Sequence, residues 1–480
     1  MRIAGGSVLG EGAPLESTFP VTGEVLHRFD GASLDQVDEA VGAARQAFDR
    51  GVWSDRTPEE RATVLEGSAD LLMARRDDLV QRVVFDNGKT LAEAEIDVMA
   101  CVGACRREAE HARQAVPRRM SDQRGVERWV SQEPVGVVAA LTPYNAPLMF
   151  AGVKSAPALA AGNSVVLKPS ERSPLVVSAF VDCLAEAGLP PGVLNLVHGR
   201  VDVAAHLSSH PGVDMVTLTG GNAAGRAVMG AAAPTVKKLL LELGGKSAHI
   251  VLGDADLEAA IPAVAAGVFR NAGQRCFSGT RLLVEESVAD EVIEGVVEIA
   301  RGLRLGDPFE ETTQVGPLID GAAVEAAEAF VERSRGEARV LCGGRRREDL
   351  APGAFFPPTV LADCDPRSYP AQEELFGPVL TVLRVRGAQH AVEVANATPY
   401  GLAGGVWSRD EDKARRVAGR LRAGYVWVNT YAAVFGDVPF GGFGQSGIGR
   451  EAGIWGYDAY TEWKTLMVDS AGGASAPLFR

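Results

Sequence analysis

The segment Gly273–Gly279, which reads GQRCFSG, contains a single cysteine, Cys276. The glycines at its two ends allow tight backbone turns, and such turns could leave the thiol open to a substrate. An ordinary cysteine thiol has a pKa near ~8.5, so a nucleophilic Cys276 needs a local group that favours the thiolate. The segment alone fits two interpretations about equally: a covalent nucleophile, or a buried cysteine just before a strand.

Glu242 ends an apolar run, Leu239–Leu241, that is typical of a buried strand. Burial raises the pKa of a carboxyl group, which suits a general base that takes up a proton near neutral pH. Three bases, Lys237, Lys238 and Lys246, are close to it in the sequence. An ion pair with one of them is the simpler interpretation, and the segment alone slightly favours it.

Asn145 lies between two prolines in the sequence TPYNAPL, at a predicted strand-to-helix turn. A fixed amide NH2 can donate to a developing oxyanion, and losing such a donor typically lowers the rate by ~10²–10³. The alternative is an asparagine that satisfies the backbone of its own turn. The segment alone favours this second interpretation.

Apolar spacing predicts helices in the first third of the chain, over residues 34–49, 58–76 and 79–114. From residue 128, short apolar runs alternate with small-residue helices, which predicts parallel βαβ units. The predicted strands are 135–141, 164–167, 193–197, 215–219, 239–242, 248–252, 281–285, 339–341, 379–385, 404–407 and 425–428. The predicted helices between them are 152–161, 174–187, 201–208, 222–231, 287–302, 321–335, 388–396 and 411–421. We therefore expect two α/β units that meet near residue 245.

The composition excludes several classes of protein. The chain has 480 residues, 46% of them hydrophobic and 23% charged, as in an ordinary globular enzyme. Its formal net charge of −14 argues against binding to nucleic acid. No apolar run is long enough to span a membrane without prolines or charges, and no signal peptide is recognisable, so we expect a cytoplasmic protein. The six cysteines show neither a disulfide framework nor metal-ligand spacing, so we expect no metal site.

Nine motifs in a fixed order then make the sequence resemble the NAD(P)-dependent, non-acylating aldehyde dehydrogenases, from about residue 15 to 467. These motifs are TPYNAPL, LKPSE, LTGG, LELGGKSAHIV, GQRCFSG, EELFGPVL, NATPYGLAGGV, WVN and PFGGFGQSGIGRE. The resemblance implies oxidation of an aldehyde to a carboxylic acid. It also implies an α/β fold with two doubly wound domains, one for the cofactor and one for catalysis, plus a small β oligomerisation element.

The resemblance assigns a role to each of the residues above. Cys276 matches the nucleophile, which forms a thiohemiacetal and then a thioester with the substrate. Asn145, together with the backbone N–H of Cys276, matches the oxyanion donors. Glu242 matches the base that activates water for deacylation. Glu451 matches a carboxylate that assists proton transfer in some members, and Lys154 could belong to the same relay. An ion pair with Arg450, or another structural contact of Glu451, is the simpler alternative.

The resemblance also implies a cofactor site for NAD. A carboxylate beside the adenosine ribose repels a 2′-phosphate, so NADP is possible but less favoured. The turn before a predicted helix matches the pyrophosphate contact, where backbone N–H groups favour an anion. The family usually has a serine at the end of this turn, where this chain has glycine. The matching positions are Lys168 and Glu171 for the adenosine ribose, Thr219, Gly220 and Gly221 for the pyrophosphate, and Glu374 and Phe376 for the nicotinamide ribose and ring.

Six residues align with the walls of the family's substrate pocket, and all of them are apolar or aromatic. Since none is a cation, we expect an uncharged aliphatic or aromatic aldehyde rather than a dicarboxylic semialdehyde. Each of the six could instead belong to the core. These residues are Tyr144, which replaces a common tryptophan, Phe150, Val153, Phe277, Val434 and Phe440.

The domain boundaries follow from the same resemblance. Residues 1–114 and 135–245 would form the NAD-binding domain, and residues 246–460 the catalytic domain. Residues 115–134 and 461–480 would form the oligomerisation element of a homodimer or homotetramer. Three other functions compete: a CoA-acylating dehydrogenase, in which Glu242 would be unnecessary; a thiol esterase that needs no NAD; and a non-catalytic structural protein.

Overall fold

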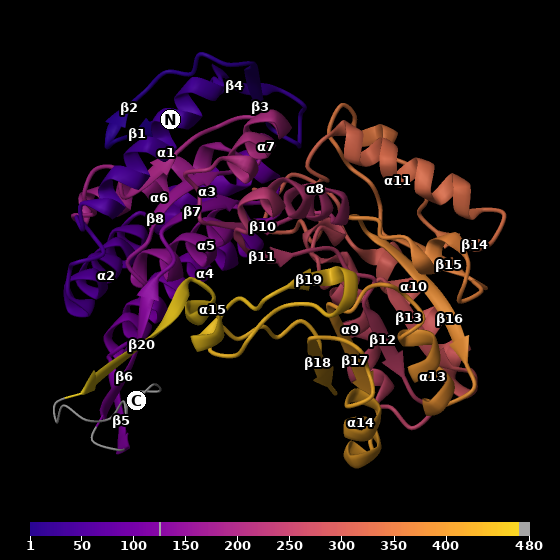
Figure 1. Ribbon diagram of the computed structural model, residues 1–480. Helices are drawn as coiled ribbons and strands as arrows, with labels where there is room; N and C mark the ends of the chain where they lie inside the picture. Colours follow the sequence, from indigo (N-terminus) through magenta and orange to yellow (C-terminus); the bar gives the residue numbers. More distant parts are fainter. Residues whose placement is uncertain (124–125, 470–480) are drawn as a thin grey trace.

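The computed structural model describes residues 1–123 and 126–469, in which two large sheets lie side by side with helices around them (Figure 1). Within these residues the first sheet has eight strands, in the order β19-β11-β10-β7-β8-β9-β1-β2. Its five central strands are parallel, and β1 and β19 pair antiparallel with their neighbours. The bounds are β1 Arg2–Ile3, β2 Gly6–Ser7, β7 Val137–Leu141, β8 Ser164–Lys168, β9 Leu194–Leu196, β10 Met215–Thr219, β11 Lys238–Glu242 and β19 Gly447–Ile448.

Helices α1–α8, which lie between residues 34 and 232, surround this sheet. Ser33 and Thr57 both form capping boxes, with Gln36 and Glu60 respectively, which explains why α1 and α2 begin where the sequence predicts. The bounds are α1 Leu34–Asp49, α2 Pro58–Ala74, α3 Arg76–Asn87, α4 Leu91–Gln114, α5 Pro147–Ala160, α6 Leu175–Glu186, α7 Val201–Ser209 and α8 Asn222–Ala232.

The direction of the chain through the first sheet reverses between β7 and β10. From β7 the chain adds β8 and β9 on one side, and then returns to add β10 and β11 on the other. In an open parallel sheet, ligands bind beyond the carboxyl ends of the strands at such a switch point. The segments that follow β7 and β10 there contain Asn145 and Gly220–Gly221.

The second sheet has seven strands among the described residues, in the order β14-β15-β16-β13-β12-β17-β18, and all neighbours except β14 and β15 are parallel. Its strands are β12 Ala248–Val251, β13 Arg281–Glu285, β14 Arg339–Cys342, β15 Thr359–Ala362, β16 Val379–Val385, β17 Ala403–Trp407 and β18 Tyr425–Val428. Its helices are α9 Leu257–Phe269, α10 Ala289–Gly302, α11 Gly321–Ser334, α12 Tyr369–Gln372, α13 Ala388–Ala395 and α14 Glu411–Ala418.

A smaller antiparallel sheet extends from the body as an arm (Figure 1). It consists of β20 Thr461–Asp469, β6 Val126–Pro134 and β5 Arg118–Gln123, in that order. A separate hairpin pairs β3 Pro14–Thr18 with β4 Val25–Asp30, and α15 Gly453–Ala459 precedes the arm. The predicted small β element is therefore present over residues 118–123, 126–134 and 461–469, while residues 470–480 lie outside the described part.

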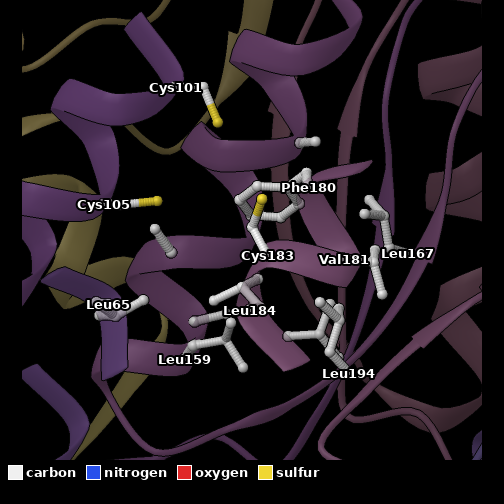
Figure 2. Close-up of a cluster of buried hydrophobic side chains, with 14 of the residues drawn as sticks. Leu65, Cys101, Cys105, Leu159, Leu167, Phe180, Val181, Cys183, Leu184 and Leu194 are labelled. Carbon is white, nitrogen blue, oxygen red and sulfur yellow. The ribbon is translucent and has the colours of Figure 1, made fainter. Parts of the chain in front are cut away.

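Figure 2 shows the apolar core beside the first sheet, where side chains from α2, α4, α5 and α6 pack together. Cys101, Cys105 and Cys183 are fully buried in this core among leucines, a valine and Phe180. The i, i+4 cysteines of α4 are thus packing residues. Within the described residues, no helix has the length and apolar character needed to cross a bilayer.

The α/β fold with two largely parallel sheets confirms the predicted fold class, but one predicted helix is wrong and several elements were not predicted. The helix predicted over residues 79–114 is two helices, because Gly88 takes a left-handed conformation (φ 79°) after α3 and Thr90 starts α4 with a new capping box. Strands β1–β4 and β15 were not predicted, because short strands carry little alternation. Helix α9 was not predicted either, because Pro262 and its almost uniformly apolar sequence hide the helical period. The division into cofactor-binding and catalytic domains stays a prediction, and β19 shows that residues 447–448 return to the first sheet.

Candidate active site

Cys276 lies in a strained loop, residues 270–279, which we call the nucleophile loop. Within it, Asn271 and Ala272 adopt left-handed backbone angles, with φ of 54° and 50°. Gly273 is also left-handed, and a Cβ there would come within 2.1 Å of the Gly377 carbonyl oxygen. Non-glycine residues in this region cost free energy and persist where the surroundings enforce them, commonly at functional sites.

The Cys276 side chain is half-buried, and its thiol is in an acidic setting. Burial raises the pKa of Cys276 to about 12, and the carboxylates of Glu242, Glu374 and Glu451 raise it further. The thiol is therefore protonated at neutral pH in this structure. Any attack by the sulfur requires a nearby group that takes the proton.

Glu242 is at the carboxyl end of β11 and is only 3% exposed. Neither of its carboxyl oxygens has a hydrogen-bond partner among the described residues. Burial raises the pKa of Glu242 well above its ordinary value of 4.5, and the negative charge of Glu451 adds to the effect. Gly441 leaves room for this side chain, since a Cβ there would be 2.6 Å from Glu242 Oε1.

The three lysines near Glu242 in the sequence bind elsewhere. Lys237 donates to two backbone carbonyl oxygens at 2.7 and 2.8 Å. Lys238 pairs with a different carboxylate at 3.2 Å, and the Lys246 Nζ lies 5.4 Å from the centre of an aromatic ring. The ion-pair interpretation that the segment alone favoured is therefore wrong for Glu242, and its carboxyl group is left without such a partner.

Asn145 connects the first sheet to the nucleophile loop. It follows β7 and is 7% exposed, and its Nδ2 donates to the Gln274 carbonyl oxygen at 2.9 Å. Gln274 is two residues before Cys276, so this hydrogen bond fixes the amide beside the thiol. A primary amide has two N–H donors. One donor of Asn145 holds the loop, and the second has no partner among the described residues.

Glu451 and Lys154 form a buried ion pair. Lys154 on α5 is 0% exposed, and its Nζ lies 2.6 Å from Glu451 Oε1 and donates to Thr217 Oγ1 at 3.0 Å. Arg450 instead donates to two backbone carbonyl oxygens. Arg450 therefore does not pair with Glu451, and the structural contact that Glu451 makes is the ion pair with Lys154. Since Glu451 and Lys154 both influence the pKa of Glu242, the three groups form one electrostatic unit.

The predicted ribose and pyrophosphate contacts lie at the switch point of the first sheet. Lys168 ends β8, and its Nζ is 3.3 Å from Glu171 Oε2. Thr219 ends β10, and its buried Oγ1 has no hydrogen-bond partner among the described residues. Gly221 precedes α8 without a side-chain cap, and a Cβ there would meet nothing within 4 Å. The turn through Gly220 therefore presents free helix N–H groups to open space.

Glu374 and Phe376 lie between this turn and the nucleophile loop. Glu374 Oε1 accepts a hydrogen bond from the Gly245 N–H at 3.0 Å, and burial raises the pKa of Glu374 to about 7. The ring of Phe376 packs edge-on against Tyr144 at 6.0 Å. Tyr144, predicted as a wall of the substrate pocket, therefore contacts a residue predicted to bind the cofactor.

The remaining predicted pocket walls are only partly brought together. Phe277 and Phe440 pack edge-on with ring centres 6.1 Å apart. Val434 is 45% exposed on the loop after β18. Phe150 and Val153 lie on α5, the first buried and the second half-buried. The contacts thus support Phe277 and Phe440 as a pair, and the other walls stay predictions.

The sequence analysis missed three residues that contact Phe277. Tyr431 donates from its hydroxyl to the Phe277 carbonyl oxygen at 2.8 Å, and its ring stacks on His249. The ring of Trp427 lies 6.1 Å from that of Phe277. The guanidinium of Arg275 lies 5.2 Å above the same ring. For Tyr431 the sequence carries no signal, because the contact joins segments 154 residues apart.

Comparisons with known proteins agree with this arrangement. The model of the aldehyde dehydrogenase family matches residues 8–466. A betaine aldehyde dehydrogenase from Bacillus subtilis (strain 168) is 41% identical, covering 92% of this chain and 91% of its own. The NADP/NAD-dependent aldehyde dehydrogenase PuuC from Escherichia coli (strain K12) is 38% identical, and the match covers 95% of this chain and 93% of that protein.

Solved structures give the same result at the level of the fold. A crystal structure of an NAD-dependent aldehyde dehydrogenase from Sinorhizobium meliloti superposes with a TM-score of 0.97 at 38% identity, covering 100% of this chain and 96% of the other. A crystal structure of betaine aldehyde dehydrogenase from Staphylococcus aureus in complex with NAD+ superposes with a TM-score of 0.96 at 36% identity. The match covers 98% of this chain and 95% of the other. This chain belongs to the aldehyde dehydrogenase family.

Proposed function

We propose that this protein oxidises an aldehyde to a carboxylic acid with NAD, and that Cys276 is the nucleophile. The observation that carries the proposal is that three reactive groups lie in one site and are not fully engaged by the rest of the protein. These are the half-buried thiol of Cys276, the second amide N–H of Asn145 and the partnerless carboxyl group of Glu242. The thiol is the nucleophile, the amide N–H stabilises the negative oxygen, and the carboxyl group removes a proton from water.

The first step is attack of the Cys276 sulfur on the aldehyde carbon. Because the thiol is protonated at rest, its proton has to leave before the sulfur attacks, and we assign water in the site as the acceptor, so that Glu242 acts only in the later deacylation. The carbonyl oxygen becomes an oxyanion, and the free N–H of Asn145 together with the Cys276 backbone N–H would stabilise it. The product of this step is a thiohemiacetal.

The dinucleotide site fits NAD. The uncapped N-terminus of α8 and the unpartnered Thr219 hydroxyl suit a pyrophosphate, and the Glu171 carboxylate suits free ribose hydroxyls. A cavity of about 210 Å³ adjoins Glu171 and is also lined by Arg172, Arg200 and Asp320. When bound, NAD supplies the two-electron acceptor that turns the thiohemiacetal into a thioester.

Glu242 completes the turnover by activating water. Its raised pKa lets it take a proton from a water molecule near neutral pH, so that hydroxide attacks the thioester and releases the acid. The buried pair of Lys154 and Glu451 would receive that proton in turn and return Glu242 to its charged form. The thiol of Cys276 is regenerated.

An NAD-coupled assay across aldehydes, with and without CoA, tests this function. We expect turnover with NAD, none after Cys276→Ala, and no requirement for CoA. A requirement for CoA would favour the acylating alternative, and ester hydrolysis without any NAD-linked oxidation would favour the esterase. The partnerless Glu242 favours water as the acceptor, because transfer to CoA needs no such base.

A further inference from the structure

Arg275, the residue before Cys276, has a guanidinium group that is not ion-paired within the described residues. Its Nη2 donates to the carbonyl oxygens of Ala266 and Gly267, at 2.8 and 3.1 Å. Its Nε is buried and has no hydrogen-bond partner in the part of the chain that the structure describes. A guanidinium has five N–H donors, and the half-buried guanidinium of Arg275 has no anion beside it among the described residues. The missing partner is therefore expected from outside the chain.

The position of this group points to the substrate. The guanidinium lies 5.2 Å from the ring centre of Phe277, and that ring lies 6.1 Å from the rings of Phe440 and Trp427. Phe277 and Phe440 are the two predicted walls that the structure brings together. Cys276 is between Arg275 and Phe277 in the chain, and its side chain contributes to the pKa of Arg275, so the cation and the apolar wall lie near the nucleophile.

The chain itself does not neutralise Arg275. Glu93 raises its pKa, but both Glu93 oxygens are engaged, with the Asn271 N–H at 2.6 Å and with Thr90. Burial and the like charge of Arg270 lower the pKa of Arg275 to about 10. The group therefore stays charged at neutral pH, and the nearby exposed Arg270 adds positive charge on the same loop.

We propose that Arg275 binds an anionic group of the substrate, so that the preferred aldehydes carry a carboxylate, as the semialdehydes of short dicarboxylic acids do. The inference deepens the proposed function and rests on it. It replaces the expectation of an uncharged aldehyde, which considered only the six apolar or aromatic walls. A charge-assisted bond from guanidinium to carboxylate is stronger than a neutral hydrogen bond.

The same charge argues against a cationic substrate. Several relatives are named betaine aldehyde dehydrogenases, and betaine aldehyde carries a trimethylammonium group. A guanidinium beside the nucleophile would repel that group, because like charges in a partly buried site interact strongly. Betaine aldehyde is therefore expected to be a poor substrate of this chain.

Two four-carbon aldehydes test the proposal: succinic semialdehyde, which has a carboxylate, and butanal, which has none. With NAD, wild-type kcat/KM is expected to be at least tenfold higher for the semialdehyde. Arg275→Met should lower the ratio of the two kcat/KM values at least tenfold, and Arg275→Lys should restore part of it. Arg301→Met is the matched control and should leave the ratio unchanged. Arg301 also donates to a backbone carbonyl oxygen, but it is an exposed residue of α10.

The outcomes separate this inference from the proposed function. If wild type oxidises butanal as well as or better than the semialdehyde, the substrate inference is overturned and the proposed function stands. If Arg275→Met lowers both kcat/KM values equally, Arg275 only anchors the end of α9 and the inference is again overturned. If the folded wild type oxidises neither aldehyde nor any other with NAD, the proposed function itself fails. The wild-type comparison decides the matter even if the variants do not fold.

Discussion

Among the buried carboxyl groups of the described residues, only that of Glu242 has no hydrogen-bond partner on either oxygen. Asp97 is as buried as Glu242, yet it pairs with Lys89 at 2.9 Å and accepts the Met149 N–H. Glu242 has no such partner among the described residues. Because a buried polar group without a partner is costly, its presence indicates a role in binding or catalysis. The same reasoning applies to Arg275.

Cys276→Ala should abolish aldehyde oxidation, because no other thiol adjoins Asn145 and Glu242 among the described residues. Cys342→Ala is the matched control, since Cys342 is the other half-buried cysteine and lies on β14. It should retain full activity. Steady-state production of reduced cofactor measures both variants, and measurable turnover by a folded Cys276→Ala protein would refute nucleophilic catalysis by this residue.

Glu242→Gln should form reduced cofactor in one burst and then stall. The substituted side chain keeps its size but cannot take a proton from water, so the thioester accumulates. We expect a burst of about one equivalent per active site, as this chemistry requires, followed by a steady rate lowered by roughly 10²-fold or more. Rapid-mixing absorbance measures it, and an unchanged steady rate at neutral pH would remove Glu242 from the role of base.

The pH profile of kcat should report the electrostatic unit around Glu242. The base must be ionised, so activity rises with pH as Glu242 loses its proton, and its raised pKa moves this rise above the ordinary 4.5. Glu451→Gln removes a like charge and should move the rise to lower pH. Lys154→Met removes an opposite charge and should move it to higher pH. Shifts in the opposite directions, or no shifts, would show that another group controls the rise.

At the scale of the elements, local chemistry made much of the fold predictable. Helices α1 and α2 begin at the expected caps because each capping box lies within four residues. Asn145, Glu242 and Cys276 could be found because each has a distinctive sequence around it. Contacts between distant segments could not be predicted, since no local pattern records that Lys154 meets Glu451, 297 residues later, or that Tyr431 binds the Phe277 carbonyl oxygen from 154 residues away.

The loop after β18 supports the nucleophile loop, and its contact can be tested. Tyr431→Phe deletes the hydroxyl that donates to the Phe277 carbonyl oxygen. A lost hydrogen bond of about 1.4 kcal/mol corresponds to about tenfold in rate if the contact positions the thiol. We expect kcat to fall by about tenfold with little change in KM. A rise in KM alone, or a loss of thermal stability at unchanged kcat, would assign Tyr431 a different role.

At the scale of the whole molecule, the arm exposes an apolar strand edge that another chain could cover. Strand β20 forms an edge of its sheet and exposes large apolar side chains, with Trp463 58%, Leu466 56% and Met467 65% exposed. Exposed apolar edge strands invite pairing with another chain. The arm therefore supports the predicted homodimer or homotetramer.

Leu466→Asp should weaken that assembly, because it places a charge on the exposed apolar strand. Leu9→Asp is the control, since Leu9 is 89% exposed and lies outside the arm. Sedimentation at several protein concentrations should find wild type and Leu9→Asp as oligomers and Leu466→Asp shifted toward monomer. A wild-type protein that sediments as a stable monomer would contradict the prediction.

Mass spectrometry of the acylated enzyme tests the central claim most directly. Glu242→Gln protein is mixed with NAD and an oxidisable aldehyde, quenched in acid and digested. The account predicts that the peptide containing Cys276 gains the mass of the acyl group, and that wild type loses this adduct as it turns over. An aldehyde that is oxidised while Cys276 stays unmodified in the slow variant would contradict covalent catalysis by this thiol.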